Sequence, residues 1–478
     1  MLWRHTASYL LARGVPGLVS LLAIAVYTRL LAPEQYGQYA LVIAGVGLAN
    51  KLVFEWLRLG LLRFLPAMRE RPDSLLATIA ATYLGLVITT GAAGAVALAL
   101  TDPGSRWLVA AGMPLLWIQA LFDLELERAR GQLLPKRYGL MAVTRVCLAL
   151  ALGVLFVLVG FGALGLLLAL IVGMLVALIL PLTAELRHLR LARFDPALLS
   201  RLSRYGGPLA VTAALSFLIG SSDRFLIGWL LSDAAVGRYA VAYDLTSFSI
   251  GLLLTIVNLA AYPLVVRALE DHGLERARQQ LTASSTALLA VGLPAAIGLI
   301  VLARPLAGLL LGAQFQADAA TLIPLIAVAA LLRDLKAYYF DLAFHLGRNT
   351  LGQIWVTLAA ACVSIGLNLW LIPRFGLVGA ACANISAYAV ALVLSWLLGR
   401  RVFALPRPSV DSLKIALAAL VMGGGLWLLA GATGPLAVLA QVVVGALVYA
   451  SMMLILDAAN ARRHLRRFLG RHHQEGTS

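Results

Sequence analysis

The sequence LLAPEQYGQYA at residues 30–40 is matched by LLSDAAVGRYA at residues 230–240. Both stretches begin with Leu-Leu and, after five intervening residues, continue with Gly-x-Tyr-Ala. Each stands where one apolar segment ends, a short polar turn follows and the next apolar segment begins. A match of this kind predicts that the chain contains two related copies of one helical bundle.

A second match supports the duplication. The sequence FGALG at residues 161–165 corresponds to FGLVG at residues 375–379, and each lies in a short turn between two apolar segments. The two matches occur in the same order along the chain and predict a unit of six membrane spans that occurs twice. Because an even number of spans returns the chain to its starting side, both copies have the same orientation, and the repeat is parallel about an axis along the membrane normal.

The composition predicts that most of the chain is surrounded by lipid. Of 478 residues, 61% are hydrophobic and only 13% are charged, whereas a soluble domain is about half apolar and about a quarter charged. Such a chain cannot hide its apolar surface from water, so we expect most of it to lie in a bilayer. The three cysteines stand in apolar runs without CxxC spacing, and we expect them to be small buried side chains rather than metal ligands.

Apolar runs of about 17–25 residues, separated by polar or Gly/Pro turns, predict fourteen membrane spans. They lie at about 8–31, 39–60, 74–101, 106–127, 138–158, 164–184, 207–230, 238–262, 281–302, 320–343, 350–372, 377–399, 411–430 and 435–457. The stretch 303–319 is predicted to form a short interfacial helix. We expect no cleavable signal peptide, because the first run is long enough to span and lacks a small-residue cleavage site.

Basic residues sort the loops into two sets. One set includes Arg63, Arg128, Arg130, Lys136, Arg137, Arg267, Arg400 and Arg401 with both chain ends, whereas the other holds little beyond Arg106, Arg304 and Arg374. The positive-inside rule places the first set and both termini in the cytoplasm. The formal net charge of +16 is then mostly topological, and we expect no nucleic-acid partner.

These observations predict five segments. They are an N-terminal six-helix bundle at 1–184, a cytoplasmic linker at 185–206, a C-terminal six-helix bundle at 207–399, helices 13 and 14 at 400–457, and a basic cytoplasmic tail at 458–478.

The motifs at residues 28–40, 223–240 and 368–379 resemble those of the MOP superfamily of membrane flippases and drug extruders. The resemblance covers nearly the whole chain and is strongest to the polysaccharide biosynthesis (Wzx-type) oligosaccharide flippases. It implies an all-α fold of about fourteen transmembrane helices, with two six-helix repeats around a central cavity that alternates between inward-open and outward-open states. It also implies a cargo of lipid-linked (undecaprenyl-diphosphate) oligosaccharide, a place in the bacterial inner membrane, and a polysaccharide polymerase or chain-length regulator as partner.

Ionisable residues inside the spans are the candidates for function, because each costs roughly 2.5–3.5 kcal/mol on insertion scales and therefore faces protein or water. The cationic candidates for a substrate-binding cavity are Arg13, Lys51, Arg58, Arg145, Arg333 and Lys336. The candidates for a gate or for ion coupling are Glu55, Asp123, Asp223, Arg224, Asp334 and Asp341.

The second span holds Lys51, Glu55 and Arg58 on one helix face, at spacings of four and three residues. They could line the cavity as a cationic stripe that receives a diphosphate. They could equally form a self-satisfied salt-bridge ladder against span 1 or span 4. Arg13 and Arg58 lie in the cytoplasmic third, where snorkelling to the lipid surface is an alternative.

The tenth span carries two polar stripes. Arg333 and Lys336 can share one face, and Asp334, Tyr338, Asp341 and His345 can share another. The stripes suit a cavity wall or a polar helix–helix contact, and Asp341 with His345 could relay a proton.

Near the outer end of span 7, the adjacent residues Asp223 and Arg224 point about 100° apart and need separate partners, for which Arg29 and Asp244 are candidates. They suit an outer gate or a structural anchor.

The sequence contains no set of residues typical of a soluble enzyme and no Walker-type loop, so we expect a transporter without a cofactor or metal. An ion gradient, the membrane potential or consumption of the cargo would then drive it. The alternatives are a small-molecule antiporter of the drug-extruder type, which would be expected to place acids in spans 1 and 2, and a membrane-embedded polymerase or glycosyltransferase, which would need a longer outer loop or a cytoplasmic catalytic segment.

Overall fold

The computed structural model describes residues 2–68, 72–186, 193–347, 349–406, 409–429, 431–432 and 434–463. Within these ranges the chain forms helices joined by short turns, and no strand is present. Among the described residues, ten helices are long and apolar enough to cross a membrane, and a bent pair of helices adds an eleventh span if it is counted as one. The expected all-α, multi-pass membrane fold is therefore confirmed.

The chain divides into two compact units. Unit 1 comprises Met1–Val241 and Ser364–Gly376, and unit 2 comprises Ala242–Val363 and Leu377–Ser478.

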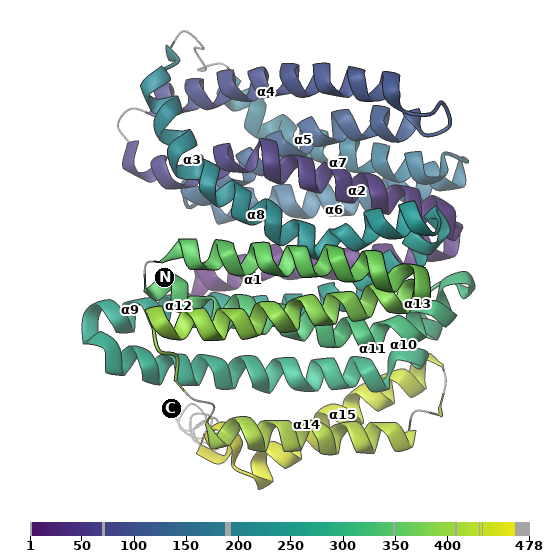
Figure 1. The fold of residues 1–478 in the computed structure, drawn as a ribbon, viewed down its shortest axis with the longest axis vertical. Coiled ribbons are helices and arrows are strands. Elements are labelled where there is room, and N and C mark those ends of the chain that lie inside the picture. The colour runs from purple at the N-terminus through teal and green to yellow at the C-terminus, as the bar shows by residue number, and fades with distance from the viewer. Residues whose placement is uncertain are drawn as a thin grey trace, which may run out of the picture. The chain divides into compact units, whose positions relative to one another are not determined.

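Unit 1 contains the first eight helices of the chain (Figure 1). They are α1 (Leu2–Leu30), α2 (Pro33–Val53), α3 (Glu55–Phe64), α4 (Pro72–Leu100), α5 (Arg106–Gly131), α6 (Pro135–Leu158), α7 (Gly162–Leu186) and α8 (Pro196–Leu230), with a short 3₁₀ turn η1 (Pro66–Met68). Neighbouring pairs include α6 with α7, α1 with α6, and α2 and α3 with α8.

Unit 2 contains the greater part of α9 (Asp233–Val301) and of α13 (Thr350–Val402). Its other elements are α10 (Ala303–Leu310), α11 (Ala313–Leu335), the π-helical turn η3 (Lys336–Phe340), α12 (Leu342–Leu346), α14 (Val410–Leu429), α15 (Pro435–Ile455) and a 3₁₀ turn η4 (Ala458–Asn460). Helices α14 and α15 lie against each other (Figure 1).

Local sequence explains where several helices begin. Proline occupies the first turn of α2, α6, α8 and α15, where its missing N–H is not needed and its fixed φ suits the helix. The carboxylate of Asp195 caps α8 by accepting hydrogen bonds from the backbone N–H groups of Ala197 (2.9 Å) and Leu198 (3.3 Å). The Asn349 side chain accepts one from Gly352 N–H (3.2 Å) at the start of α13.

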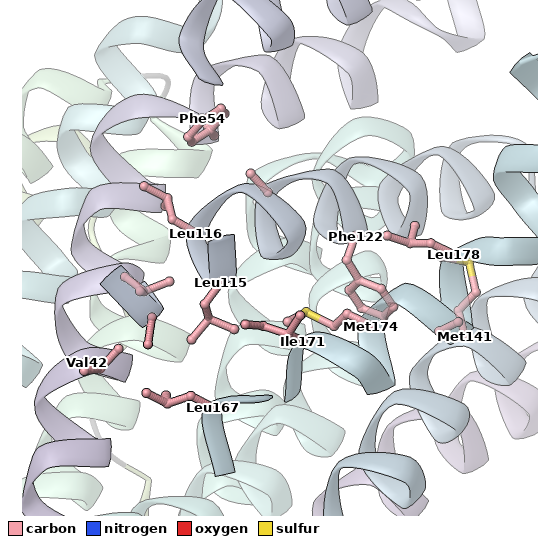
Figure 2. Packing of buried hydrophobic residues seen from close by; sticks show 14 residues of the cluster. Val42, Phe54, Leu115, Leu116, Phe122, Met141, Leu167, Ile171, Met174 and Leu178 are labelled. Carbon is pink, nitrogen blue, oxygen red and sulfur yellow. The ribbon is translucent and has the colours of Figure 1, made fainter. Parts of the chain in front are cut away.

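The core of unit 1 is apolar and joins α2, α5, α6 and α7. Figure 2 shows Leu115 and Phe122 of α5 pointing toward Leu167, Ile171 and Met174 of α7. Leu115 and Leu167 are fully buried. Because lipid tails are as apolar as these side chains, tight packing rather than escape from water holds such helices together inside a bilayer.

Two helices are too long to be single spans. Helix α9 has 69 residues and α13 has 53, so α9 would be about 100 Å long if straight, against a hydrocarbon core of about 30 Å. Each contains one glycine with positive φ, Gly273 (79°) in α9 and Gly376 (56°) in α13. These kinks fall between predicted spans 8 and 9 and between predicted spans 11 and 12. The exact number of fourteen spans stays a prediction.

The motif matches found in the sequence have structural counterparts. Gly162 and Gly376, which occupy the same place in the FGALG and FGLVG motifs, adopt nearly the same φ, 52° and 56°. Such left-handed backbone favours glycine because it has no Cβ.

Gly37 and Gly237, the glycines of the other motif, mark a close approach of the first turns of α2 and α9. A Cβ at Gly37 would collide with the carbonyl of Asp233, and a Cβ at Gly237 would collide with the carbonyl of Pro33. The contact is reciprocal, since each glycine lies against the residue four positions before the other. Glycine at both positions therefore permits a close approach of the two backbones.

Span 2 is not one regular helix. Helices α2 and α3 are bent by 51° relative to each other at Phe54, whose side chain is almost completely buried. The bend lies between Lys51 and Glu55 and was not anticipated from the residue spacing.

Some expectations from the sequence are adjusted or left open by the structure. The stretch 303–319 contains the short helix α10, but α11 already begins at Ala313, before the predicted start of span 10.

The three cysteines differ in burial. Cys147 and Cys362 are exposed and only Cys382 is partly buried, so the expected burial is wrong for the first two. An apolar thiol facing outward from a span incurs no transfer penalty in lipid. Parts of the predicted linker (187–192) and basic tail (464–478) lie outside the described residues, and the predicted domain boundaries stay predictions.

Candidate functional site

The polar residues of span 2 form an ion-pair cluster around Glu55. Its carboxylate, which is only 4% exposed, receives Lys51 Nζ at 3.0 Å and also accepts hydrogen bonds from the Arg58 guanidinium. The Lys51 and Arg58 side chains are 29% and 28% exposed. The three residues share one face as the spacing predicts, although the chain bends between the first and second of them.

Helix α5 completes this cluster from a second direction. Arg58 Nη1 lies 3.1 Å from Glu127 Oε1, and Asn50 Nδ2 donates to Asp123 Oδ2 at 2.9 Å. Asn50 and Glu127 were not among the candidates from the sequence, because neither stands in the spacing pattern of its own helix. The contact with α5 has the geometry of the predicted salt-bridge ladder against span 4.

Arg145 of α6 extends the cluster further. Its guanidinium carbon lies 5.1 Å from the centroid of the Phe122 ring, a cation–π geometry. Arg145 also attracts the neighbouring Asp123 carboxylate electrostatically. Its buried Nε has no hydrogen-bond partner among the described residues. Arg145 is thus held by a ring and by a charge.

A separate ion-pair group lies at the ends of α5 and α6. Glu125 receives Arg137 Nη2 at 3.1 Å and Arg128 Nη1 at 3.6 Å. Glu125 of α5 thus has two cationic partners outside the cluster around Glu55.

The polar residues of predicted span 10 form a second cluster in unit 2. Arg333 and Asp334 are adjacent in sequence and form a two-point ion pair, with Nε–Oδ1 at 2.8 Å and Nη2–Oδ2 at 3.3 Å. Arg333 Nη1 also lies 3.4 Å from Tyr243 Oη and 3.3 Å from Ser247 Oγ, both on α9. The arginine therefore joins α11 to α9.

A π-helical turn sets the geometry of the remaining pair. In η3 the backbone N–H of Asp341 donates to the carbonyl of Lys336, five residues earlier, at 2.9 Å. This turn brings residues five apart onto one side, where an α-helix would separate them. Lys336 Nζ lies 2.7 Å from Asp341 Oδ2 as a result.

Asp341 is buried among several donors. Besides Lys336, it accepts hydrogen bonds from Gln353 Nε2 (3.2 Å) and Ser395 Oγ (2.8 Å), both on α13. The expected stripe of Asp334, Asp341 and His345 assumed an α-helical spacing that the π turn interrupts. The side chain of His345 is exposed, whereas Asp341 is only 3% exposed.

The adjacent residues Asp223 and Arg224 of α8 are both buried. Asp223 accepts a hydrogen bond of 2.6 Å from the Tyr239 hydroxyl and one of 2.8 Å from the backbone N–H of Arg224. Tyr239 is the tyrosine of the Gly-x-Tyr-Ala motif, so the motif supplies a partner that the sequence did not suggest.

The remaining cationic candidate, Arg13, lies on α1, but its side chain is outside the described residues.

Carboxylates offset most of the positive charge in each cluster. In unit 1, Lys51, Arg58 and Arg145 accompany three carboxylates, and Arg130 Nη1 also lies 3.5 Å from Glu127 Oε1. In unit 2, Arg333 and Lys336 accompany two carboxylates. Such compensation lowers the cost of placing charges in a membrane. An anionic ligand that binds Lys51, Arg58, Arg333 or Lys336 therefore competes with a carboxylate partner. Within the described ranges, no group of three or more His, Cys, Asp or Glu side chains could hold a metal ion.

Comparison with known protein families gives one match. The family described as "Polysaccharide biosynthesis protein" matches residues 26–320. Among curated proteins, the chain is 27% identical over 248 residues to the "Probable low-salt glycan biosynthesis flippase Agl15" of Haloferax volcanii. The match covers 51% of this chain and 50% of that relative. The chain therefore spans about half the length of the curated relative that it matches.

Solved structures share the fold. The lipid II flippase MurJ in its inward closed conformation has a TM-score of 0.76 and 14% identity, with 95% of this chain and 98% of that chain covered. An inward-facing multidrug resistance MATE family transporter of the MOP superfamily has a TM-score of 0.63 and 17% identity, with 82% and 97% covered. At these identities, the likeness is one of fold.

Proposed function

We propose that this chain, which belongs to the polysaccharide biosynthesis protein family, is a flippase that moves a lipid-linked oligosaccharide across a membrane. The family match and the shared fold confirm the resemblance to the polysaccharide branch of the MOP superfamily. Our proposal extends to an undecaprenyl-diphosphate carrier, to alternating access as the mode of transport, and to a bacterial inner membrane with both termini in the cytoplasm. A polysaccharide polymerase or chain-length regulator is the partner we propose.

The observation that carries the proposal is the pair of cation-containing clusters inside the spans. A diphosphate headgroup must leave water during passage, and charge-assisted hydrogen bonds from lysine or arginine can replace its hydration. Lys51 and Arg58 share Glu55, and both keep more than a quarter of their side-chain surface exposed. A diphosphate could therefore take over these cations as Glu55 is released.

The direct test is a translocation assay with purified protein in proteoliposomes. The substrate is an oligosaccharide on undecaprenyl diphosphate, and a membrane-impermeant glycosidase reports how much of it has crossed. We expect Lys51→Glu and Arg333→Glu to slow translocation by about tenfold or more, since one hydrogen bond to a charged group contributes about 1.5–3 kcal/mol and 1.4 kcal/mol is about tenfold.

Lys414→Glu is the matched control. Lys414 lies on α14 and also pairs with an aspartate on its own helix, Asp411, at 3.7 Å, but it belongs to neither cluster. If both cluster variants fold correctly and translocate the substrate at the wild-type rate, the clusters do not take part in transport. Absence of translocation by the wild-type protein would overturn the flippase proposal itself.

A small-molecule antiporter is the second candidate. The carboxylates of Glu55, which is buried, and of Asp123, which is partly buried, are groups in unit 1 that could bind an organic cation. Uptake of a fluorescent organic cation by the same proteoliposomes, driven by a proton or sodium gradient, would favour this reading over the flippase.

A further inference from the structure

A cleft in unit 1 opens between α6 and α7, and none of its lining residues belongs to the ion-pair cluster around Glu55. It has a volume of about 540 Å³, within the range of about 300–1,000 Å³ that small-molecule sites occupy. Its α6 wall follows one helix face, and α7 supplies the opposite wall. The lining residues are Lys136, Arg137, Leu140, Met141, Thr144, Val176, Ala177 and Ile179.

The cleft is apolar along its length and faces outward from the unit. Leu140, Val176 and Ile179 are 57%, 40% and 54% exposed, respectively. Met141 and Ala177 are buried and form its floor, and Figure 2 shows Met141 beside Leu178 and Phe122 of the core. In a membrane-spanning chain, such a surface contacts acyl chains, so hydrocarbon is the filling that its chemistry favours.

One end of the cleft is basic. Lys136 and Arg137 lie in the first turn of α6, and Thr144 lies about 12 Å further along the same helix. Glu125 binds both Arg137 and Arg128, so one carboxylate faces two guanidinium groups. Lys136 is exposed and forms no ion pair within the part of the chain that the structure describes. Among the side chains that the structure describes, the end of the cleft therefore carries a net positive charge.

An apolar cleft with a cationic end has the chemistry of a bound lipid with an anionic headgroup. Basic pockets between membrane helices on the cytoplasmic side bind such headgroups, and the positive-inside pattern places Lys136 and Arg137 on that side. We propose that this cleft binds one anionic phospholipid of the bilayer, with its phosphate at Lys136 and Arg137 and an acyl chain along Leu140, Thr144 and Val176.

The experiment measures lipid retention rather than transport, so its outcome is independent of the flippase proposal. Detergent-purified, delipidated full-length protein is titrated with phosphatidylglycerol or phosphatidylcholine, and native mass spectrometry counts the bound lipids. We expect the wild-type protein to bind one phosphatidylglycerol more tightly than phosphatidylcholine. Lys136→Gln should lower the affinity for that phosphatidylglycerol about fivefold, which corresponds to the loss of about 1 kcal/mol for one lysine near an anionic surface.

Two further variants make the result specific. Lys414→Gln removes a lysine from the end of another membrane helix, outside the cleft, and should bind both lipids as the wild-type protein does. Val176→Trp fills the cleft from an exposed position, where the fold should tolerate it. It should weaken the binding of both lipids. The inference is overturned if Lys136→Gln behaves as Lys414→Gln does, or if Val176→Trp leaves binding unchanged.

The carrier lipid of the proposed cargo is the competing occupant. Undecaprenyl diphosphate is added to protein loaded with phosphatidylglycerol, and displacement is followed in the same spectra. Retention of phosphatidylglycerol in the presence of excess carrier supports a bilayer-lipid site. Complete displacement at equimolar carrier would overturn it and make the cleft a cargo site.

Discussion

The ion pairs of unit 1 extend from one helix to another, whereas those of unit 2 join residues close together in the sequence. Glu55 binds Lys51 across the bend between α2 and α3, and Arg58 continues to Glu127 on α5. In unit 2, Arg333 pairs with its own neighbour, and Lys336 pairs with Asp341 through the π turn. The contacts of the unit 2 cluster with other helices are hydrogen bonds to neutral side chains, so among the described residues of the two clusters an ion pair reaches a second helix only in that of unit 1.

The two clusters also differ in how freely their cations can change partners. Lys51 and Arg58 are 29% and 28% exposed, but Lys336 is 10% exposed and its partner Asp341 has three donors around it. A pair whose cation is partly exposed can exchange a carboxylate for another anion at low cost, while separating a buried pair leaves an uncompensated charge. We therefore propose cargo exchange at Lys51, Arg58 and Arg333, whose side chain is 25% exposed, and an architectural role for Lys336 with Asp341.

Asp341→Asn should have the largest effect on stability. The amide has the shape of the carboxylate but leaves Lys336 as a buried charge without a counter-ion, which costs about 3–5 kcal/mol. We expect a marked fall in the thermal unfolding midpoint of the purified protein in detergent. The double variant Asp341→Asn/Lys336→Met should recover most of that loss, because it removes both charges. A single variant as stable as the wild-type protein would show that the pair contributes nothing to the fold.

Glu55→Gln should destabilise the protein by less than half as much, about 1–2 kcal/mol, because Arg58 keeps Glu127 and both cations retain exposed surface. It should also tighten the binding of an undecaprenyl diphosphate, since the competing carboxylate is gone. Calorimetric titration and the unfolding midpoint measure the two effects.

Glu34→Gln serves as its control, because Glu34 is an exposed acid in the first turn of α2, the helix that carries Lys51. Weaker binding of the diphosphate by Glu55→Gln, with Glu34→Gln unchanged, would contradict an exchange of partners at this cluster.

Ser247→Ala should have the smallest effect, about 0.5 kcal/mol or less on stability. The hydrogen bond from Arg333 Nη1 to Ser247 Oγ is long, at 3.3 Å, and the arginine keeps its ion pair with Asp334. Ser249→Ala, which removes a hydroxyl bonded to its own helix at Leu245, is the comparison. A loss as large as that of Asp341→Asn would mean that α9, and not the local ion pair, fixes Arg333.

Residue spacing along the chain predicted what one helix can determine by itself. The shared face of Lys51, Glu55 and Arg58 and the paired turns at Gly162 and Gly376 follow from local rules, and both are present. Charge composition and hydrophobic run length likewise predicted a multi-pass helical membrane protein, because lipid leaves few alternatives for the backbone.

Partners contributed by other helices could not be predicted in this way. Glu127, Asn50, Gln353 and Ser395 show no pattern that links them to the residues they bind. For Asp223, the Arg29 partner suggested by opposite charges stays a prediction, and the Tyr239 hydroxyl is a partner that the sequence did not indicate. The bend at Phe54 and the π turn at Lys336 also escaped prediction, since single-residue breaks in a helix leave the hydrophobic pattern almost unchanged.

The π turn at Lys336–Phe340 also bears on how homologous chains should be aligned through this helix. A π turn accommodates one residue more than the α-helix around it, as a single insertion would. A gap-free alignment to a relative with a regular helix here would match Asp341 and every later position to residues rotated by about 100°. Comparisons of Asp341 or His345 between family members therefore require a one-residue gap within positions 336–340.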